Sequence, residues 1–337
     1  MPDKTSQHRG TGVLATSQPC IHTGAMEKIY IGIDGGGTRT RLGIMTRDRT
    51  ILHQSHAKSS NIYAVGEAQA KENVKVLLDQ SLSLFTGRAI GGLCFGSAGL
   101  GREEERQTWQ SFFDGYFENT VQAVLVSDAL LQLAGNLPQP SGVCVISGTG
   151  SICIGRNGEG TVVRSGGFGS VLGDEGSGWW IAKEAIRRSL ASAEGRDLPT
   201  GLGAAIQTWL GLTRLEEVIG WANAKERTKD QVASFAPQVS HAALEGDDVA
   251  IHIMDEAIEH LVALVEATAR RLPPTWPHHL GLSGGVLERD QYIVPRIIQR
   301  LSPRWMLFHT DDAAVKGAMV MAVEGGHSRV AENSSSR

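Results

Sequence analysis

Residues 29–45 read IYIGIDGGGTRTRLGIM, an apolar run of strand length followed by a glycine turn and a second apolar run. TILHQSH at 50–56 follows at hairpin spacing, so we expect antiparallel strands on both sides of this turn. Residues 142–156, GVCVISGTGSICIGR, repeat the order of strand, glycine turn and strand. Two prolines and a glycine interrupt the pattern at 136–142, just before the repeat. The sequence therefore predicts an α/β protein built from two related halves.

Length and charge limit the classes of function. The chain has 337 residues, 41% hydrophobic and 20% charged, which is typical of a globular protein of about two domains. No apolar run approaches the roughly 18 residues of a membrane-spanning helix. The net charge of -4, without a long block of one sign, gives no reason to expect nucleic acid or a membrane as partner.

The cysteines indicate a reducing, cytoplasmic compartment. Cys94, Cys144 and Cys153 lie in apolar strand-like runs, and Cys20 lies in a polar opening segment. None has CxxC spacing, so we expect buried structural thiols. The opening segment lacks the apolar core of a secretory signal, and we expect residues 1–27 to be a disordered extension.

The glycine turns predict a phosphate-binding site. DGGGT at 34–38 has more glycines than a hairpin turn needs, and SGTGS at 147–151 repeats its chemistry. Side-chain-free amides can point into one concavity and bind an anion. Either turn alone is more typical of an ordinary tight turn, whereas two such turns at matching points of similar halves favour a site that could hold a polyphosphate from both sides. The expected phosphate-binding residues are Gly36, Gly37, Thr38, Gly148, Thr149, Gly150 and Ser151.

Two other phosphate-binding patterns are absent from the sequence, which excludes the P-loop enzymes and disfavours a dinucleotide-binding protein. The chain contains neither the Walker pattern nor a GxGxxG turn that opens a helix after the first strand. Asp34 ends the first predicted strand and would lie beside the phosphates. A carboxylate in that place favours a bridging Mg²⁺.

Five motifs resemble the BadF/BadG/BcrA/BcrD-type ATPases of the actin/Hsp70/sugar-kinase fold, and among them the N-acetylglucosamine and glucosamine kinases. They are IGIDGGGTRT at 31–40, LVSDALLQLAG at 125–135, VISGTGS at 145–151, GGFGSVLGDEGSGWWIAKEA at 166–185 and LSGGVL at 282–287. The resemblance runs from about residue 28 to 325. It implies two ribonuclease-H-like lobes with ATP and substrate in the cleft between them.

The resemblance also implies domain boundaries. We expect an N-terminal lobe at 28–136, completed by a C-terminal helix at 312–325, and a C-terminal lobe at 137–311. The Ser- and Glu-rich tail at 326–337 is expected to be disordered.

Roles for individual residues follow from the motifs that match. Asp128 matches the catalytic aspartate of the family, which accepts a hydroxyl proton, although an aspartate between strand and helix is also typical of a helix N-cap. Asn61 matches the asparagine of the sugar-binding turn, and an ordinary turn asparagine is the alternative. The expected sugar contacts on the glycine-rich loop are Gly167, Phe168, Gly169, Asp174 and Glu175. Gly284 and Gly285 are expected beside the adenosine.

The predicted function is an ATP-dependent amino-sugar kinase acting on the 6-hydroxyl of N-acetylglucosamine or glucosamine, with Mg²⁺. Asn61 and Phe168 lean toward the acetamido sugar and Glu175 leaves the free amine open. The alternative is an ATPase activator of an acyl-CoA reductase or dehydratase, which would need cysteines for an iron–sulfur cluster at a dimer interface. No matching pair of cysteines is present. A small-molecule sugar is the expected partner, and a homodimer is the default assembly.

Overall fold

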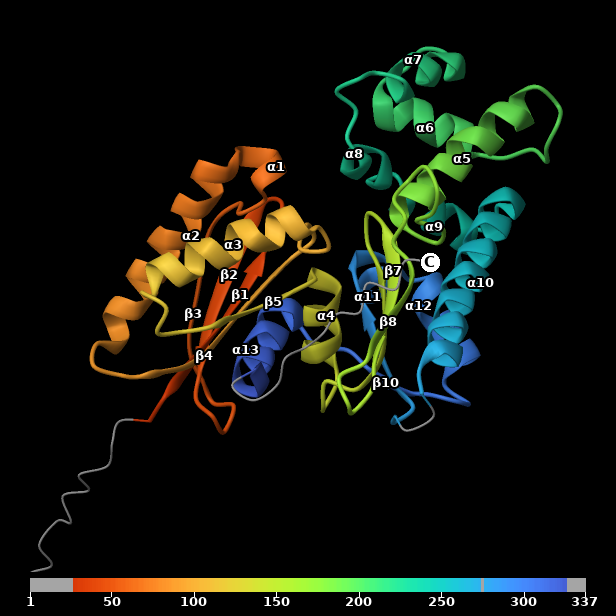
Figure 1. Ribbon diagram of the computed structural model, residues 1–337. Coiled ribbons are helices and arrows are strands. Elements are labelled where there is room, and N and C mark those ends of the chain that lie inside the picture. The colour runs from red at the N-terminus through yellow and green to blue at the C-terminus, as the bar shows by residue number, and fades with distance from the viewer. Residues whose placement is uncertain (1–26, 274–275, 326–337) are drawn as a thin grey trace, which may run out of the picture.

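The computed structural model describes residues 27–273 and 276–325. Cys20, the expected extension except Glu27, and the expected tail lie outside these residues. Within them the chain forms two α/β lobes that lie side by side (Figure 1). Each lobe contains a five-stranded sheet.

The first sheet has the strand order β3-β2-β1-β4-β5. Its strands are β1 (Ile29–Gly35), β2 (Arg39–Met45), β3 (Ile51–Lys58), β4 (Ile90–Ser97) and β5 (Ala123–Val126). β1 and β2 pair antiparallel, as do β2 and β3, while β4 runs parallel to β1 and β5 to β4. The antiparallel strands predicted around the first glycine turn are therefore confirmed.

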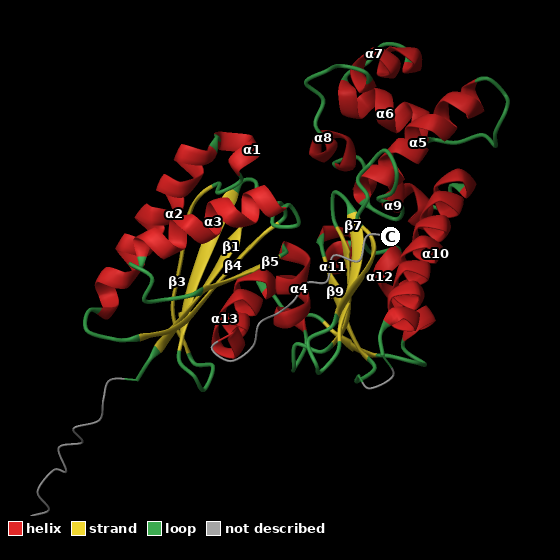
Figure 2. Cartoon of the chain, in the orientation of Figure 1, coloured by secondary structure: helices red, strands yellow, loops and turns green. Residues whose placement is uncertain are grey.

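Helices cover both faces of this sheet (Figure 2). They are α1 (Ile62–Val65), α2 (Glu67–Leu82), α3 (Glu103–Tyr116), α4 (Asp128–Asn136) and α13 (Ala313–Gly325), with a 3-10 turn η1 (Ser83–Phe85). Side chains of a strand point alternately to opposite faces. Ile31 and Ile33 of β1 accordingly pack in a core with α2 and α3, whereas Tyr30 packs in a core with α4 and α13.

The second sheet repeats the first. Its order is β10-β9-β6-β7-β8, with the same pattern of antiparallel and parallel pairs. Its strands are β6 (Gly142–Ser147), β7 (Ser151–Arg156), β8 (Val162–Gly166), β9 (His279–Ser283) and β10 (Met306–Phe308). The two related halves and the α/β fold class are therefore confirmed.

The helices of the second lobe form a core on one face of this sheet and a group beyond its upper edge (Figure 1). They are α5 (Gly178–Ala193), α6 (Leu202–Leu210), α7 (Val218–Ala222), α8 (Lys229–Ala233), α9 (Ala236–Leu244), α10 (Asp248–Arg271), α11 (Gly285–Arg289) and α12 (Ile293–Leu301), with a 3-10 turn η2 (Leu215–Glu217). The long helix α10 packs against β6, β7 and β8. On the other face, α4 contacts β6, β7 and β9 and also β1 and β4, so α4 lies between the two sheets.

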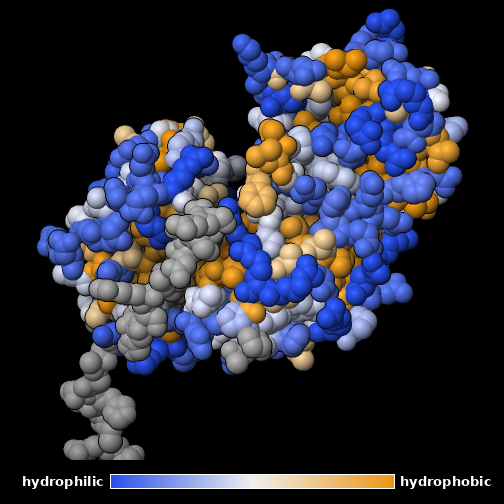
Figure 3. All heavy atoms as spheres, turned by 45° about the vertical axis from the view of Figure 1, so that its right-hand side comes forward, coloured by the Kyte–Doolittle hydropathy of each residue, from blue (hydrophilic) through white to orange (hydrophobic). Residues whose placement is uncertain are grey.

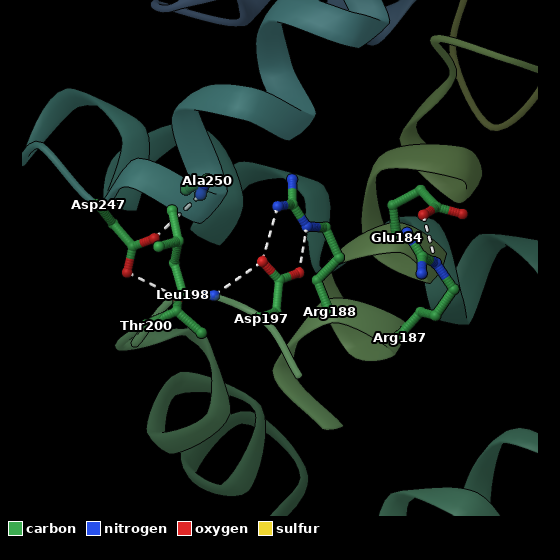
Figure 4. A network of polar contacts seen from close by, with 8 residues as sticks. All are labelled: Glu184, Arg187, Arg188, Asp197, Leu198, Thr200, Asp247 and Ala250. Atoms are coloured by element: carbon green, nitrogen blue, oxygen red, sulfur yellow. Dashed lines mark hydrogen bonds and ion pairs between the residues drawn. The ribbon is translucent and has the colours of Figure 1, made fainter. Parts of the chain in front are cut away.

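A polar network joins α5 to the start of α6 and α10 (Figure 4). The Arg188 guanidinium donates to both oxygens of Asp197, at 2.7 and 3.0 Å. These hydrogen bonds, above all, lower the pKa of Asp197 to about 2. Asp247 caps α10 through the Ala250 amide and also accepts from Thr200. The loop between α5 and α6 is thereby fixed to the helical layer.

Within the described ranges, no helix combines the length and the apolar character needed to cross a bilayer. The view in Figure 3 shows a mostly hydrophilic surface with a notch between the lobes and apolar side chains at its border.

Candidate active site

The strand ends of the first sheet bring the polar residues of this lobe together. β1, β3, β4 and β5 run in one direction, so Asp34, Asn61 and Asp128 follow the same edge of the sheet. In the parallel register, Asp34 aligns with Gly96, and Gly96 with Val126, two residues before Asp128. In α/β sheets, ligands bind outside the carboxyl ends of parallel strands.

The second sheet places its glycine-rich segments at the corresponding edge. β6 ends at Ser147, β8 at Gly166 and β9 at Ser283, and these ends are aligned through Ile146 and Ile152. The turn at 148–150, the loop at 166–178 and Gly284 therefore lie together. The helices that follow these edges, α1 and α5, lie at the upper side of both lobes in Figure 1.

Asp34 is a buried carboxylate held by Arg41. The Arg41 Nε and Nη2 atoms lie 3.1 and 3.0 Å from Asp34 Oδ2. The third nitrogen, Nη1, lies 2.7 Å from Asp312 Oδ1, just before α13. Burial, above all, raises the pKa of Asp34; Arg41 acts against this shift, and the negative charge of Asp128 adds to it. The structure thus places the two aspartates close enough for their charges to interact.

Asp128 lies in the first turn of α4. The helix N-cap is Ser127, whose Oγ accepts from the Leu130 amide at 3.3 Å. The alternative that Asp128 itself is the N-cap is therefore wrong, because a hydroxyl one residue earlier has taken that role. The Asp128 side chain is accessible to solvent, but many protein atoms surround the carboxylate. This burial raises the pKa of Asp128, while the Ala129 amide acts against the shift.

The residues near Asp34 fit a magnesium ion bound mainly through a nucleotide. Among the described residues no group of three or more acidic, His or Cys side chains could hold a metal. Mg²⁺ in phosphate-transferring sites is bound by one or two carboxylates, with phosphate oxygens and water completing the shell. Two neighbouring carboxylates with raised pKa values also carry charge that a cation would offset.

The first glycine turn closes on itself with one of its amides. The Gly36 amide donates to the Arg39 carbonyl at 3.1 Å, a hydrogen bond that closes the hairpin, so this amide is not among the free donors of the turn. The Gly36 carbonyl accepts from Ser59. The amides of Gly37 and Thr38 donate to no acceptor in the described part of the chain. Two donors of this turn thus remain for a ligand.

In the second turn, too, acceptors within the protein occupy part of the amides. Gly148 donates to the Gly150 carbonyl, and Ser151 donates to Asp174 Oδ1 at 3.2 Å, so these two predicted phosphate donors are occupied. The hydroxyl groups of this turn are also occupied: Ser147 donates to Gly176, Ser151 to Glu175 and Thr149 to Asp230. Within the described ranges, the amides of Thr149 and Gly150 have no protein acceptor.

Asp174 supports the second turn. Its Oδ1 accepts from Ser151, and its Oδ2 lies 3.4 Å from Lys229 Nζ, a lysine that the sequence analysis did not single out. The residue is buried and has a φ of 64°. Glu175, the other predicted carboxylate, is half-buried and meets the turn through its carbonyl.

The remaining predicted sugar contacts come from both lobes. Asn61 caps α1, its Oδ1 accepting from Tyr63, and its Nδ2 lies 4.0 Å from where a side chain on Gly37 would begin. It is thus both a cap and a neighbour of the first turn. Phe168 is exposed between Gly167 and Gly169, which have φ values of 71° and 78°.

Gly284 and Gly285 pack against the second turn. A Cβ on Gly284 would lie 2.4 Å from the Ser147 carbonyl oxygen, and the φ of Gly284 is 89°. A Cβ on Gly148 would lie 3.9 Å from the Gly285 nitrogen. Gly284 therefore has to be glycine for this approach, whereas a side chain on Gly148 would make only ordinary contact with Gly285.

A cavity of about 620 Å³ opens beside these glycines. This volume is in the range of pockets for small ligands. It extends from Gly148 and Gly285 along α8, α9 and α11. Its lining includes Ala233, Ala236, Pro237, His241, Val286 and Arg289.

Sequence reasoning missed these cavity residues and also Arg41, Asp312 and Lys229. The cavity residues come from helices without a recognisable motif. Arg41 could have been found from the strand pattern. Side chains alternate along β2, so Arg41 lies on the same face as Gly43, which faces α13.

The repeated sheets, each with a glycine turn at the same edge, define a two-lobed α/β protein of sugar-kinase architecture. The chain matches the model of the BadF/BadG/BcrA/BcrD ATPase family over residues 31–318. It is 33% identical over 304 residues to an N-acetylmuramic acid/N-acetylglucosamine kinase of Clostridium acetobutylicum, covering 88% of this chain and 98% of the relative. It is 30% identical over 313 residues to an N-acetyl-D-glucosamine kinase of Dictyostelium discoideum, with 88% and 98% covered.

A solved structure described as an N-acetylglucosamine kinase of Chromobacterium violaceum has a TM-score of 0.65 at 25% identity, covering 88% of this chain and 99% of that one. The chain belongs to the BadF/BadG/BcrA/BcrD ATPase family. The predicted enzyme class, a phosphotransferase with an alcohol acceptor, is confirmed by these relatives.

Proposed function

We propose that this protein is an amino-sugar kinase that transfers the γ-phosphoryl group of ATP to the 6-hydroxyl of N-acetylglucosamine or glucosamine. The observation that carries the proposal is the arrangement of unpaired amides and acidic groups. Each glycine turn keeps two amides without a protein acceptor in the described chain, and Asp34 and Asp128 follow the same sheet edge as the first turn. The names of the kinase relatives support the choice of substrate class.

The residues divide the chemistry between binding and proton transfer. The amides of Gly37, Thr38, Thr149 and Gly150 would hold phosphate oxygens, and the cavity beside Gly285 would hold the nucleoside. Asp34 would hold Mg²⁺, which supplies charge neutralisation on the phosphates when it is bound.

Asp128 would act as general base. In the transfer step a bond forms between the sugar O6 and the γ-phosphorus, while the bond from that phosphorus to the bridging oxygen breaks and ADP leaves. The hydroxyl proton passes to the Asp128 carboxylate. A raised pKa makes this carboxylate a better proton acceptor than an ordinary aspartate.

Release of ADP tests the proposal directly. N-acetylglucosamine, glucosamine and N-acetylmuramic acid would each be assayed with Mg-ATP, and phosphorus NMR of the product would show whether O6 carries the phosphate. We expect turnover with at least one of the first two sugars. No ADP release with any sugar, or phosphate on another oxygen, would contradict the proposal.

Asp128→Asn should keep sugar binding and lower turnover by roughly 10²–10⁴-fold, the range for a lost general base. The matched control is Asp248→Asn. Asp248 occupies the same position in α10, one residue after the N-cap, and is exposed. Equal turnover of both variants would remove Asp128 from the role of base.

The alternative function, an activator with an iron–sulfur cluster, finds no support in the described cysteines. Cys94, Cys144 and Cys153 are fully buried in β4, β6 and β7. Burial raises the pKa of the Cys153 thiol to about 12, which disfavours the thiolate that a cluster requires. A colourless preparation with kinase activity would exclude the alternative.

A further inference from the structure

Two carboxylates are hydrogen-bonded to the second glycine turn. Asp174 Oδ1 accepts from the Ser151 amide at 3.2 Å, and Asp230 Oδ1 accepts from the Thr149 hydroxyl. The free amides of Thr149 and Gly150 belong to this same turn. Both carboxylates repel an anion that these amides would bind, so a polyphosphate here is stabilised by a cation close by.

Lys229 is a cation at this place. It is the first residue of α8, directly before Asp230, and its Nζ lies 3.4 Å from Asp174 Oδ2. That distance is longer than the roughly 2.7–2.9 Å of a strong charge-assisted hydrogen bond. An ammonium has three donors, and this one makes no other hydrogen bond with the described residues. The Lys229 side chain is 48% exposed, so a ligand can reach it.

The two ends of the turn face different neighbours. The cavity proposed for the nucleoside is lined by Gly148 and Gly285, whereas its lining includes neither Gly150 nor Asp174. At the other end of the turn, Asp174 Oδ1 lies 2.8 Å from where a Cβ on Gly150 would be. The Lys229 ammonium, on the second oxygen of Asp174, therefore lies at the end of the turn away from the nucleoside cavity.

The same ammonium borders the loop that carries the predicted sugar contacts. Lys229 Nζ lies 3.8 Å from where a Cβ on Gly169 would be, and Gly167 and Phe168 directly precede that glycine. In phosphoryl transfer the terminal phosphate lies between the rest of the nucleotide and the acceptor hydroxyl. A cation between the second turn and the sugar loop has the position that the terminal phosphate requires.

We propose that Lys229 binds the γ-phosphoryl group of the nucleotide, moving from Asp174 to the phosphate oxygens when the nucleotide is bound. The inference rests on the proposed function, since it takes the second turn as a phosphate site. The ammonium stays protonated, and its charge offsets the negative charge on the oxygens of the group in transfer. Asp174 keeps its hydrogen bond from the Ser151 amide.

Nucleotide binding to the full chain tests this role without turnover. Calorimetry would compare a non-hydrolysable ATP analogue with ADP, each with Mg²⁺, in wild type and in Lys229→Met. We expect the variant to bind the analogue about tenfold more weakly, the loss for one hydrogen bond between charged groups at a half-exposed site, and to bind ADP as wild type does. Equal weakening of both nucleotides would show that the lysine only supports the turn. That result, or no weakening of either nucleotide, would overturn the proposal.

Three further variants complete the comparison. Lys229→Arg keeps a cation and should recover part of the affinity for the analogue; no recovery would contradict a role for the charge. Lys225→Met is the matched control, because Lys225 is an exposed lysine shortly before α8, and it should change neither affinity. If Lys229→Met does not fold, Lys229→Gln, which keeps a hydrogen-bond donor beside Asp174, takes its place in the same comparison.

The kinase assay on the same preparations separates this inference from the proposed function. Lys229→Met should lower turnover of the sugar by roughly 10²-fold, the loss for one group that stabilises charge in the transition state. Normal turnover of the variant with an unchanged preference for the analogue over ADP overturns only this inference. A preference that Lys229→Met abolishes, in a protein that phosphorylates no amino sugar, overturns only the proposed function.

Discussion

Replacing Arg41 by methionine should lower the free energy of unfolding, because it leaves the buried Asp34 carboxylate without its ion-pair partner. Asp34 accepts two guanidinium contacts on one oxygen, and its side chain is 11% exposed, against 27% for Arg41. Removing one partner of a fully buried ion pair costs about 3–5 kcal/mol. Because Arg41 is partly exposed, water can replace part of the interaction, and we expect a loss of about 2 kcal/mol in the free energy of unfolding. The contact with Asp312, which is 57% exposed, adds little.

The dependence of this loss on pH identifies its cause. Burial already raises the pKa of Asp34 above 3.8, and loss of Arg41 raises it further. The folded variant then keeps a proton at pH values where the unfolded chain has released it, so its stability falls as pH rises through that interval. The deficit against wild type should therefore be largest at pH 8 and shrink toward pH 4.

Urea denaturation at pH 4, 6 and 8 measures both quantities. Arg41→Lys, which keeps the charge but not the two parallel contacts, should recover part of the loss. Arg39→Met is the control, because Arg39 is exposed on the same strand and its charge acts on Asp34 more weakly than that of Arg41, so its deficit should be much smaller. A deficit of Arg41→Met that is the same at all three pH values would refute the assignment to Asp34.

Three further outcomes are expected. Gly317→Ala should lower the free energy of unfolding by about 3 kcal/mol, because its Cβ would lie 1.9 Å from the Leu131 carbonyl oxygen. Gly115→Ala has open space around the new Cβ and should raise the free energy of unfolding by about 0.5–1 kcal/mol. Urea denaturation would measure both changes. Asp128→Asn should melt at a higher temperature than wild type at pH 8 and lose that advantage toward pH 4. Burial raises the pKa of Asp128, so its negative charge is unfavourable in the folded state. Calorimetry in which the variant melts at a lower temperature than wild type at pH 8 would contradict this. Ala233→Phe should raise the KM for ATP by about tenfold, because the phenyl ring would fill the cavity beside Gly285. A matching rise in the KM for the sugar would show that this cavity is not the nucleoside site.

Local sequence patterns predicted the elements of the fold well. Alternating or continuous apolar runs marked β1, β2 and β6, and the repeat at 142–156 predicted the antiparallel pair of β6 and β7 in the second sheet. These features depend on neighbours in the sequence, which is why they can be read from it. The predicted domain boundaries remain a proposal. The structure adds that α4, assigned to the first lobe, also contacts β6, β7 and β9.

The site was predicted less completely, because its details depend on hydrogen bonds between distant segments. Nothing local to SGTGS shows that Ser151 donates to Asp174, 23 residues later, or that Thr149 donates to Asp230. The count of glycines predicted a row of free amides, but a closed hairpin turn uses some of them itself, as Gly36 and Gly148 do. Two free amides in each turn are what remains after the fold has satisfied its own donors.

The position of the two aspartates is determined by contacts between backbones rather than by loops. A Cβ on Gly32 would lie 2.2 Å from the Met319 nitrogen, and one on Gly135 would lie 1.8 Å from the Ala313 carbonyl. β1, α4 and α13 therefore touch main chain to main chain, and Asp34 and Asp128 lie on two of these three elements. Elements packed this closely cannot shift separately. The packing of β1, α4 and α13 therefore sets the spacing of the acidic pair, and because α4 also contacts β6, β7 and β9, the same helix positions the second sheet.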